Sequence, residues 1–113
     1  MVAAIASVDG RGRIAERSVV RALGWQAGQR LQFRPLQQAV LVRLDSQGLF
    51  TVTGQGYVRL PAPVRHWCLF SAGERVLVAA RPEHGVLIVH TLVAVEALLA
   101  EHHIALGVVS DER

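Results

Sequence analysis

The predicted fold of this chain is decided by the stretch Val8-Asp9-Gly10-Arg11-Gly12-Arg13-Ile14 near its N-terminus. Asp-Gly between two apolar runs is a strong hairpin signal, because glycine readily adopts the positive φ that a tight turn requires. The flanking residues predict one short strand at 4–8 and a second at 13–15.

The chain repeats this pattern about 44 residues later. With an offset of 44 the two glycines of the turn meet two glycines again, and one inserted residue then extends the match at an offset of 45. An ordered series of coinciding glycines and arginines indicates an internal duplication. The matched pairs are Gly10 with Gly54, Gly12 with Gly56, Val20 with Val64, Arg21 with Arg65, Gly28 with Gly73, and Arg30 with Arg75.

Both copies share one predicted plan: strand, Gly-rich turn, strand, short helix, turn and strand hairpin. We assign the first copy to residues 1–46, the second to 47–90, and a C-terminal segment to 91–113. Ser18 is the expected N-cap of the first helix and Gly24 its stop, while Pro63 suits the first turn of the second helix. The predicted helices span 18–23 and 62–69, and the remaining predicted strands span 30–34, 40–44, 49–53, 57–60, 75–80 and 86–90.

The C-terminal segment has a different pattern. Thr91 can cap a helix from 92 to about 103. Five residues recur at helical spacing: Leu92, Val95, Leu98, Leu99 and His102. Two glutamates lie off this stripe, so we predict an amphipathic helix, with residues 104–113 fraying.

The composition favours a folded domain. Of the 113 residues, 51% are hydrophobic and 19% charged. The longest uncharged stretch, 46–58, is shorter than the ~18 residues that a membrane helix needs. The N-terminus is apolar but has no preceding basic residue, so it does not resemble a secretory signal. Cys68 cannot form an internal disulfide and is expected to be buried, as are Trp25 and Trp67; we expect a cytoplasmic protein.

All twelve basic residues are arginine, and four fall within eleven residues around the first Gly-rich turn and helix: Arg11, Arg13, Arg17 and Arg21. Clustered guanidinium groups neutralise phosphates, and arginine also reads guanine edges. Two other interpretations stay open. The absence of lysine can reflect codon bias in a GC-rich genome, and the cluster can be a solvated loop paired with Asp9 or Glu16.

The order of these motifs resembles the AbrB/MazE/SpoVT family over about residues 5–90. The individual motifs are short, and their occurrence twice in series makes the match more specific. In the first copy they are Val8–Ile14, Val20–Gly24 and Gly28–Leu31; in the second they are Gly54–Pro61, Val64–Arg65 and Gly73–Val76.

The resemblance implies a mainly β fold with short helices. In this family two ββαββ units interleave into a swapped-hairpin β-barrel, and two tandem copies in one chain are similar to the MraZ-type regulators. It also implies binding of duplex DNA through arginines near the turn and the short helix. Arg13 matches the family's Gly-Arg pair, Arg21 and Arg65 match the arginine of the short helix, and Arg11 lies in the turn.

Each copy departs from the family pattern at a different place. Tyr57 replaces the arginine of the Gly-Arg pair in the second copy, and Glu16-Arg17 replaces the hydrophobic-Pro pair that Leu60-Pro61 keeps. We therefore expect the first copy to contribute more DNA contact and the second more scaffold. The predicted DNA-binding residues are Arg11, Arg13, Arg17, Arg21, Arg59 and Arg65.

The sequence thus predicts a transcriptional regulator that binds duplex DNA and forms a homo-oligomer, a dimer. The two copies can pair within one chain, across a homodimer, or both. One alternative is an antitoxin-like protein that binds a protein partner through 91–113, and another is an assembly-only barrel without DNA binding. We expect no catalytic residues, no cofactor, no metal site and no membrane association. No nucleophile motif, dinucleotide fingerprint or zinc-ligand spacing is present.

Overall fold

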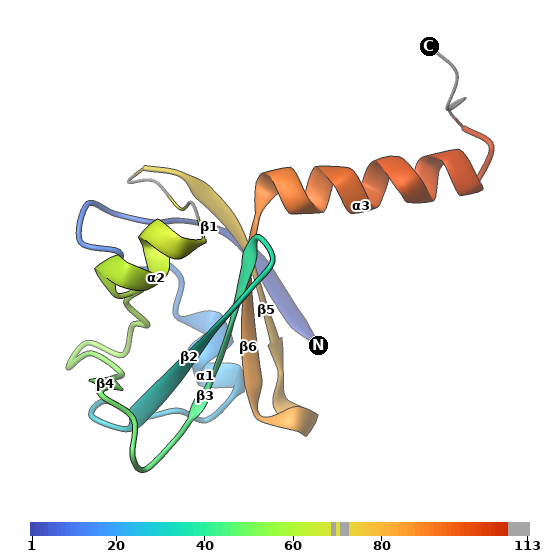
Figure 1. Cartoon of the computed structure of the whole chain (residues 1–113). Coiled ribbons are helices and arrows are strands. Elements are labelled where there is room, and N and C mark those ends of the chain that lie inside the picture. The colour runs from blue at the N-terminus through green and yellow to red at the C-terminus, as the bar shows by residue number, and fades with distance from the viewer. Residues whose placement is uncertain (69, 71–72, 109–113) are drawn as a thin grey trace.

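The computed structural model describes residues 1–68, 70 and 73–108, and these form a mainly β fold (Figure 1). Six strands build one antiparallel sheet within this described part, accompanied by three α-helices and one 3-10 turn. The elements are β1 (Val2–Ser7), α1 (Ser18–Ala22), β2 (Arg30–Leu36), β3 (Ala39–Leu44), β4 (Phe50–Thr51), α2 (Ala62–Trp67), β5 (Arg75–Arg81), η1 (Pro82–His84), β6 (Val86–Thr91) and α3 (Leu92–Ala105).

The strand order exchanges segments between the two predicted copies. The order is β1-β5-β6-β3-β2-β4, so the hairpins β2–β3 and β5–β6 meet in the middle through β3 and β6. The opening strand β1 pairs with β5 of the second copy, and β4 pairs with β2 of the first. The strand that precedes each hairpin in the sequence therefore pairs with the other hairpin, β1 with β5 and β4 with β2.

The predicted closed barrel is wrong, because the sheet is open with β1 and β4 at its edges. The strands predicted at 13–15 and 57–60 are reduced to isolated bridges, which pair Val8 with Ile14 and Arg13 with Arg59. The strand predicted at 49–53 is only two residues long. The reason is the hydrogen bonding around the Gly-rich turns. Some backbone groups there bond within their own turn, and others bond to residues distant in the sequence, as Ile14 does to Val58, so no continuous ladder connects the edges.

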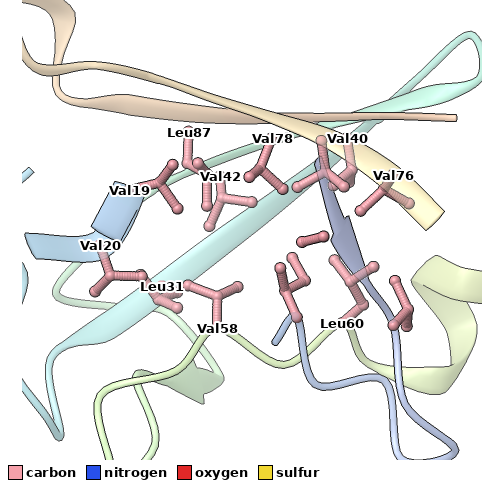
Figure 2. Packing of buried hydrophobic residues seen from close by; sticks show 14 of the residues in the cluster. Val19, Val20, Leu31, Val40, Val42, Val58, Leu60, Val76, Val78 and Leu87 are labelled. Atoms are coloured by element: carbon pink, nitrogen blue, oxygen red, sulfur yellow. The ribbon is translucent and has the colours of Figure 1, made fainter. Parts of the chain in front are cut away.

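The core lies on one face of the sheet, beneath α1, α2 and the two turns (Figure 2). Alternate side chains along the strands point into this core, and Leu31, Val42, Val78 and Leu87 are fully buried. Burying one such side chain is worth ~1.5–3 kcal/mol relative to exposure. The predicted burial of Trp25 and Cys68 is confirmed. That of Trp67 is wrong, since 74% of this residue is exposed at the end of α2.

The two short helices begin differently from each other. Ser18 is the first helical residue rather than the predicted N-cap. Its backbone amide donates a hydrogen bond to the carboxylate of Glu16 at 2.9 Å. That hydrogen bond lowers the pKa of Glu16. Gly24, with φ of +71°, follows the first helix as predicted. In α2 the predicted Pro63 lies in the first turn, and the predicted end at residue 69 lies outside the described residues.

The C-terminal helix α3 leaves the end of β6 and projects away from the sheet (Figure 1). Thr91 caps it as predicted, its hydroxyl accepting the amide of Ala94 at 3.2 Å. The predicted amphipathic stripe is wrong, because apolar residues surround the helix axis. The helix extends to Ala105, two residues beyond the predicted end, and the residues predicted to fray after 108 lie outside the described part. No helix in the described ranges is long and apolar enough to cross a membrane.

Candidate nucleic-acid interface

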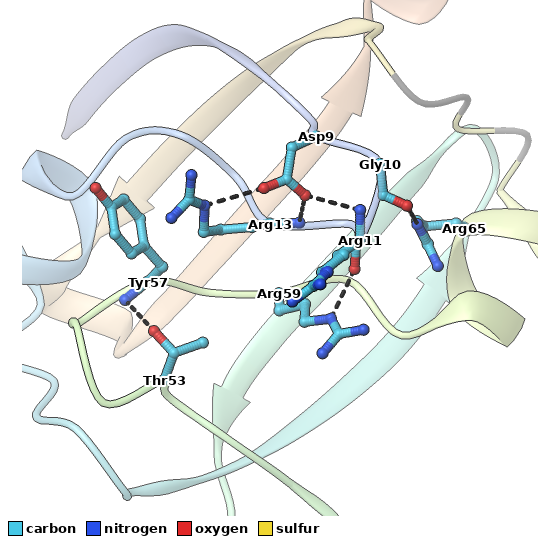
Figure 3. Close-up of polar contacts among 8 residues, drawn as sticks. All are labelled: Asp9, Gly10, Arg11, Arg13, Thr53, Tyr57, Arg59 and Arg65. Atoms are coloured by element: carbon cyan, nitrogen blue, oxygen red, sulfur yellow. Dashed lines mark hydrogen bonds and ion pairs between the residues drawn. The ribbon is translucent and has the colours of Figure 1, made fainter.

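Two Gly-rich turns with matching hydrogen bonds form the centre of the candidate site (Figure 3). In the first, the amide of Gly12 donates to the carbonyl of Asp9 at 3.0 Å, and the amide of Arg13 donates to Asp9 Oδ1 at 2.9 Å. In the second, the amide of Gly56 donates to the carbonyl of Thr53 at 2.9 Å, and that of Tyr57 donates to Thr53 Oγ1 at 3.0 Å. Asp9 and Thr53 therefore close equivalent turns.

The two turns lie directly against each other. The amide of Leu60 donates to the carbonyl of Gly12 at 2.7 Å, and the amide of Ile14 donates to the carbonyl of Val58 at 2.9 Å. Gly12 has φ of +87°, and a Cβ at this position would collide with the carbonyl oxygen of Leu60. Glycine is therefore required here both by conformation and by space.

A cavity of about 530 Å³ opens where the turns meet. Its charged side chains are three arginines and one carboxylate, so its balance is positive. The lining residues are Asp9, Arg11, Arg13, Thr53, Gln55 and Arg59, and we refer to this site as the arginine cleft.

Arg13 is held between Asp9 and Tyr57. Its Nε lies 3.1 Å from Asp9 Oδ2, and its guanidinium lies 4.6 Å from the centre of the Tyr57 ring. Hydrogen bonding by the backbone amide of Arg13, then by that of Arg11, and the charge of Arg13 lower the pKa of Asp9 from its ordinary value of 3.8. The carboxylate is thus ionised at neutral pH and orients the side chain of Arg13, which lines the cleft.

Three other arginines tie the halves together through backbone carbonyls. Arg17 NH1 donates to the carbonyl of Gln55 at 3.3 Å, and Arg65 NH1 donates to that of Gly10 at 3.3 Å. Each bond runs from the helix region of one copy to the turn of the other. Arg59 Nε donates to the carbonyl of Arg11 at 2.6 Å. These three side chains position the turns. Arg17 and Arg59 are exposed, so their remaining N–H groups are available to a ligand, whereas Arg65 is half-buried and its Nε is buried without a hydrogen-bond partner among the described residues.

Arg11 and Arg21 differ from these three arginines. Both are exposed, and within the described ranges neither side chain forms a hydrogen bond or an ion pair in the structure. Arg11 borders the cleft, whereas Arg21 lies on α1 outside its lining. Their guanidinium groups are thus the least committed to holding the fold.

The predicted site residues separate into groups in the folded chain. Arg11, Arg13 and Arg59 line the cleft. Arg17 and Arg65 donate hydrogen bonds to the turns that form it, and Arg21 lies outside its lining. The predicted loop pairing of an arginine with Asp9 is also present.

Sequence reasoning missed the part played by the second copy. Tyr57 was treated only as the loss of an arginine, but its ring faces Arg13 and also Arg17, at 5.2 Å. Thr53 was missed as the equivalent of Asp9. The offset of 44 that aligns these two residues was the available signal.

Comparison with known proteins leaves the site to be interpreted from its own geometry. No protein-family model matches the chain, and no curated protein or solved structure matches it either.

Proposed function

We propose that this protein is a DNA-binding transcriptional regulator of the AbrB-like type, in which two tandem copies combine within one chain. The exchanged strand pairing, β1 with β5 and β4 with β2, supports interleaved copies. So do the matching hydrogen bonds of the turns at Asp9 and Thr53. The proposed role is binding rather than catalysis.

The observation that carries the proposal is the arginine cleft. Arg11, Arg13 and Arg59 converge there, with a single carboxylate among the lining residues. Arginine forms bidentate bonds to phosphate and to guanine, and glycine allows the backbone to approach a phosphate closely. We assign phosphate contact to the exposed Arg11 and Arg21, and we assign base-edge readout to Arg13, whose orientation is fixed by Asp9 and Tyr57.

Fluorescence anisotropy with a labelled random-sequence duplex across a salt series tests this function. Each phosphate contact that is lost lowers the slope of log affinity against log salt by about 0.9. Arg11→Ala keeps the backbone carbonyl that Arg59 binds, so we expect an intact fold with a slope smaller by that amount. Arg21→Ala is expected to have a similar effect.

The matched control is Arg81→Ala. It removes the same charge from an exposed arginine at the β5–β6 turn, where the side chain is already paired with Glu83 at 3.2 Å. We expect its salt slope to equal that of the unaltered chain. If no duplex binds at low salt, the proposed function is wrong and the assembly-only alternative takes its place. If Arg81→Ala lowers the slope as much as Arg11→Ala, the duplex responds to the charge of the chain as a whole, and the assignment of phosphate contact to Arg11 is wrong.

A further inference from the structure

The sheet has a second face, opposite the core, that is also apolar. Strand register sets two rows across it, each running through β1, β5, β6 and β3. Ile5 is 52% exposed, and Leu77, Ile88 and Leu41 are only partly buried. We call these rows the outer sheet face; its members are Ile5, Leu77, His90 and Ala39 in one row and Ala3, Ala79, Ile88 and Leu41 in the other.

Helix α3 is a second uncovered apolar surface in the same chain. Val93, Leu98, Leu99 and Ile104 are 60%, 61%, 48% and 41% exposed, and no residue of the helix is buried. A helix that is hydrophobic all round is normally covered by protein. One of 14 residues is also marginally stable in water without packing.

The two surfaces are continuous. A groove of about 510 Å³ lies between α3 and the β2–β3 turn. Its lining includes Ala39 and His90 of the outer sheet face, together with Leu98 and Glu101 of α3. An occupant of this groove would therefore contact both the helix and the outer sheet face.

The charges on the two surfaces are opposite. Among the described residues of α3 the acidic side chains are Glu96 and Glu101, and there is no arginine. Arg34 and Arg43 lie on the outer side of the sheet, paired in register with Leu41 and Val86. Both arginines are exposed, and neither has an ion pair in the described part of the chain.

We propose that the outer sheet face binds α3 of a second copy of this chain, so that two copies associate about a twofold axis and exchange their C-terminal helices. The apolar side chains of the helix match the apolar face, and its glutamates complement the arginines beside that face. Because both surfaces belong to the same chain, a twofold contact between two copies covers both surfaces on each copy. The proposal goes beyond DNA binding and does not depend on it, because the arginine cleft shares no residue with the outer sheet face.

Sedimentation equilibrium of the full chain tests the proposal. We expect a mass of two chains of 12.3 kDa at micromolar concentration. Leu98→Glu on α3 and Ile5→Glu on the outer sheet face should each raise the dimer dissociation constant at least tenfold (roughly the loss of one well-packed contact). Circular dichroism checks the fold, which both exposed positions should preserve.

The matched control is Leu49→Glu. Leu49 is 87% exposed and precedes β4, away from the outer sheet face, so this variant should remain a dimer. A charge exchange gives a second readout: Glu101→Arg should weaken the dimer, and Arg34→Glu in the same chain should restore it. A monomeric unaltered chain overturns the proposal. So does a dimer that both Leu98→Glu and Ile5→Glu leave intact, and so does a chain that dimerises only with a different protein.

Discussion

The guanidinium of Arg13 lies 4.6 Å from the centre of the Tyr57 ring, so a residue of the first predicted copy stacks on a residue of the second. In the alignment of the copies these two residues occupy equivalent positions. The contact therefore lies at the junction of the halves, where symmetry would have placed a second arginine. Two facing arginines would repel, whereas an aromatic ring attracts the one that remains.

Tyr57→Ala should weaken DNA binding with little effect on folding. Removing the ring leaves Arg13 held by Asp9 alone. A partly exposed cation–π contact is worth ~0.5–1 kcal/mol, which corresponds to a loss of about two- to fivefold in affinity. Tyr57→Phe keeps the ring face and should bind like the unaltered chain. Anisotropy titration measures both. Equal losses in the two variants would point to the hydroxyl rather than to the stack.

Gly12→Ala should destabilise the chain by at least ~1 kcal/mol. The residue has φ of +87°, and the added Cβ would meet the carbonyl oxygen of Leu60. Gly10→Ala is the control in the same turn, since nothing lies within 4 Å of a Cβ there. We expect it to change stability by less than ~0.5 kcal/mol. Urea unfolding compares them, and similar midpoints would contradict the tight approach of the two turns.

Asp9→Asn should reduce the dependence of stability on acid pH. The folded state lowers the pKa of Asp9 below its ordinary value of 3.8, so the ionised carboxylate stabilises the fold above that value. This contribution is lost as pH falls through the lowered pKa. The difference in unfolding free energy between the two chains should thus be constant near neutral pH and shrink below 3.8. A difference that persists at the lowest pH would show that geometry, rather than charge, links Asp9 to Arg13.

Thr91→Ala should destabilise α3 by ~1 kcal/mol, because it removes the hydroxyl that accepts the amide of Ala94. Thr91→Ser retains the hydroxyl and should retain the helix. Helical circular dichroism during thermal unfolding follows the change. If helicity is the same in both variants, contacts other than this cap hold the start of α3.

Local patterns in the sequence were sufficient to predict most of the elements. Asp9-Gly10 predicted the first Gly-rich turn, and alternating apolar residues predicted the strands of the hairpins β2–β3 and β5–β6. Both predictions succeeded because turn chemistry and period-2 burial depend on neighbours in the chain. Gly24 and Thr91 marked a helix end and a helix start for the same reason. The sequence could not show that Trp67 is exposed, since apolar character alone does not reveal which face a short helix turns inward.

The tertiary structure alone decided how the two copies combine. Whether the edges of the sheet close depends on hydrogen bonds between residues about 45 apart, such as that of Ile14 with Val58, which no local pattern encodes. The division of the arginines has the same origin. Arg17 and Arg65 hold the two turns together because folding brings each side chain to a backbone carbonyl of the opposite turn, at 3.3 Å. The side chain of Arg11 remains exposed to solvent. By itself the sequence determined that arginines surround a duplicated glycine turn; only packing decided which of them hold the fold and which are available to a ligand.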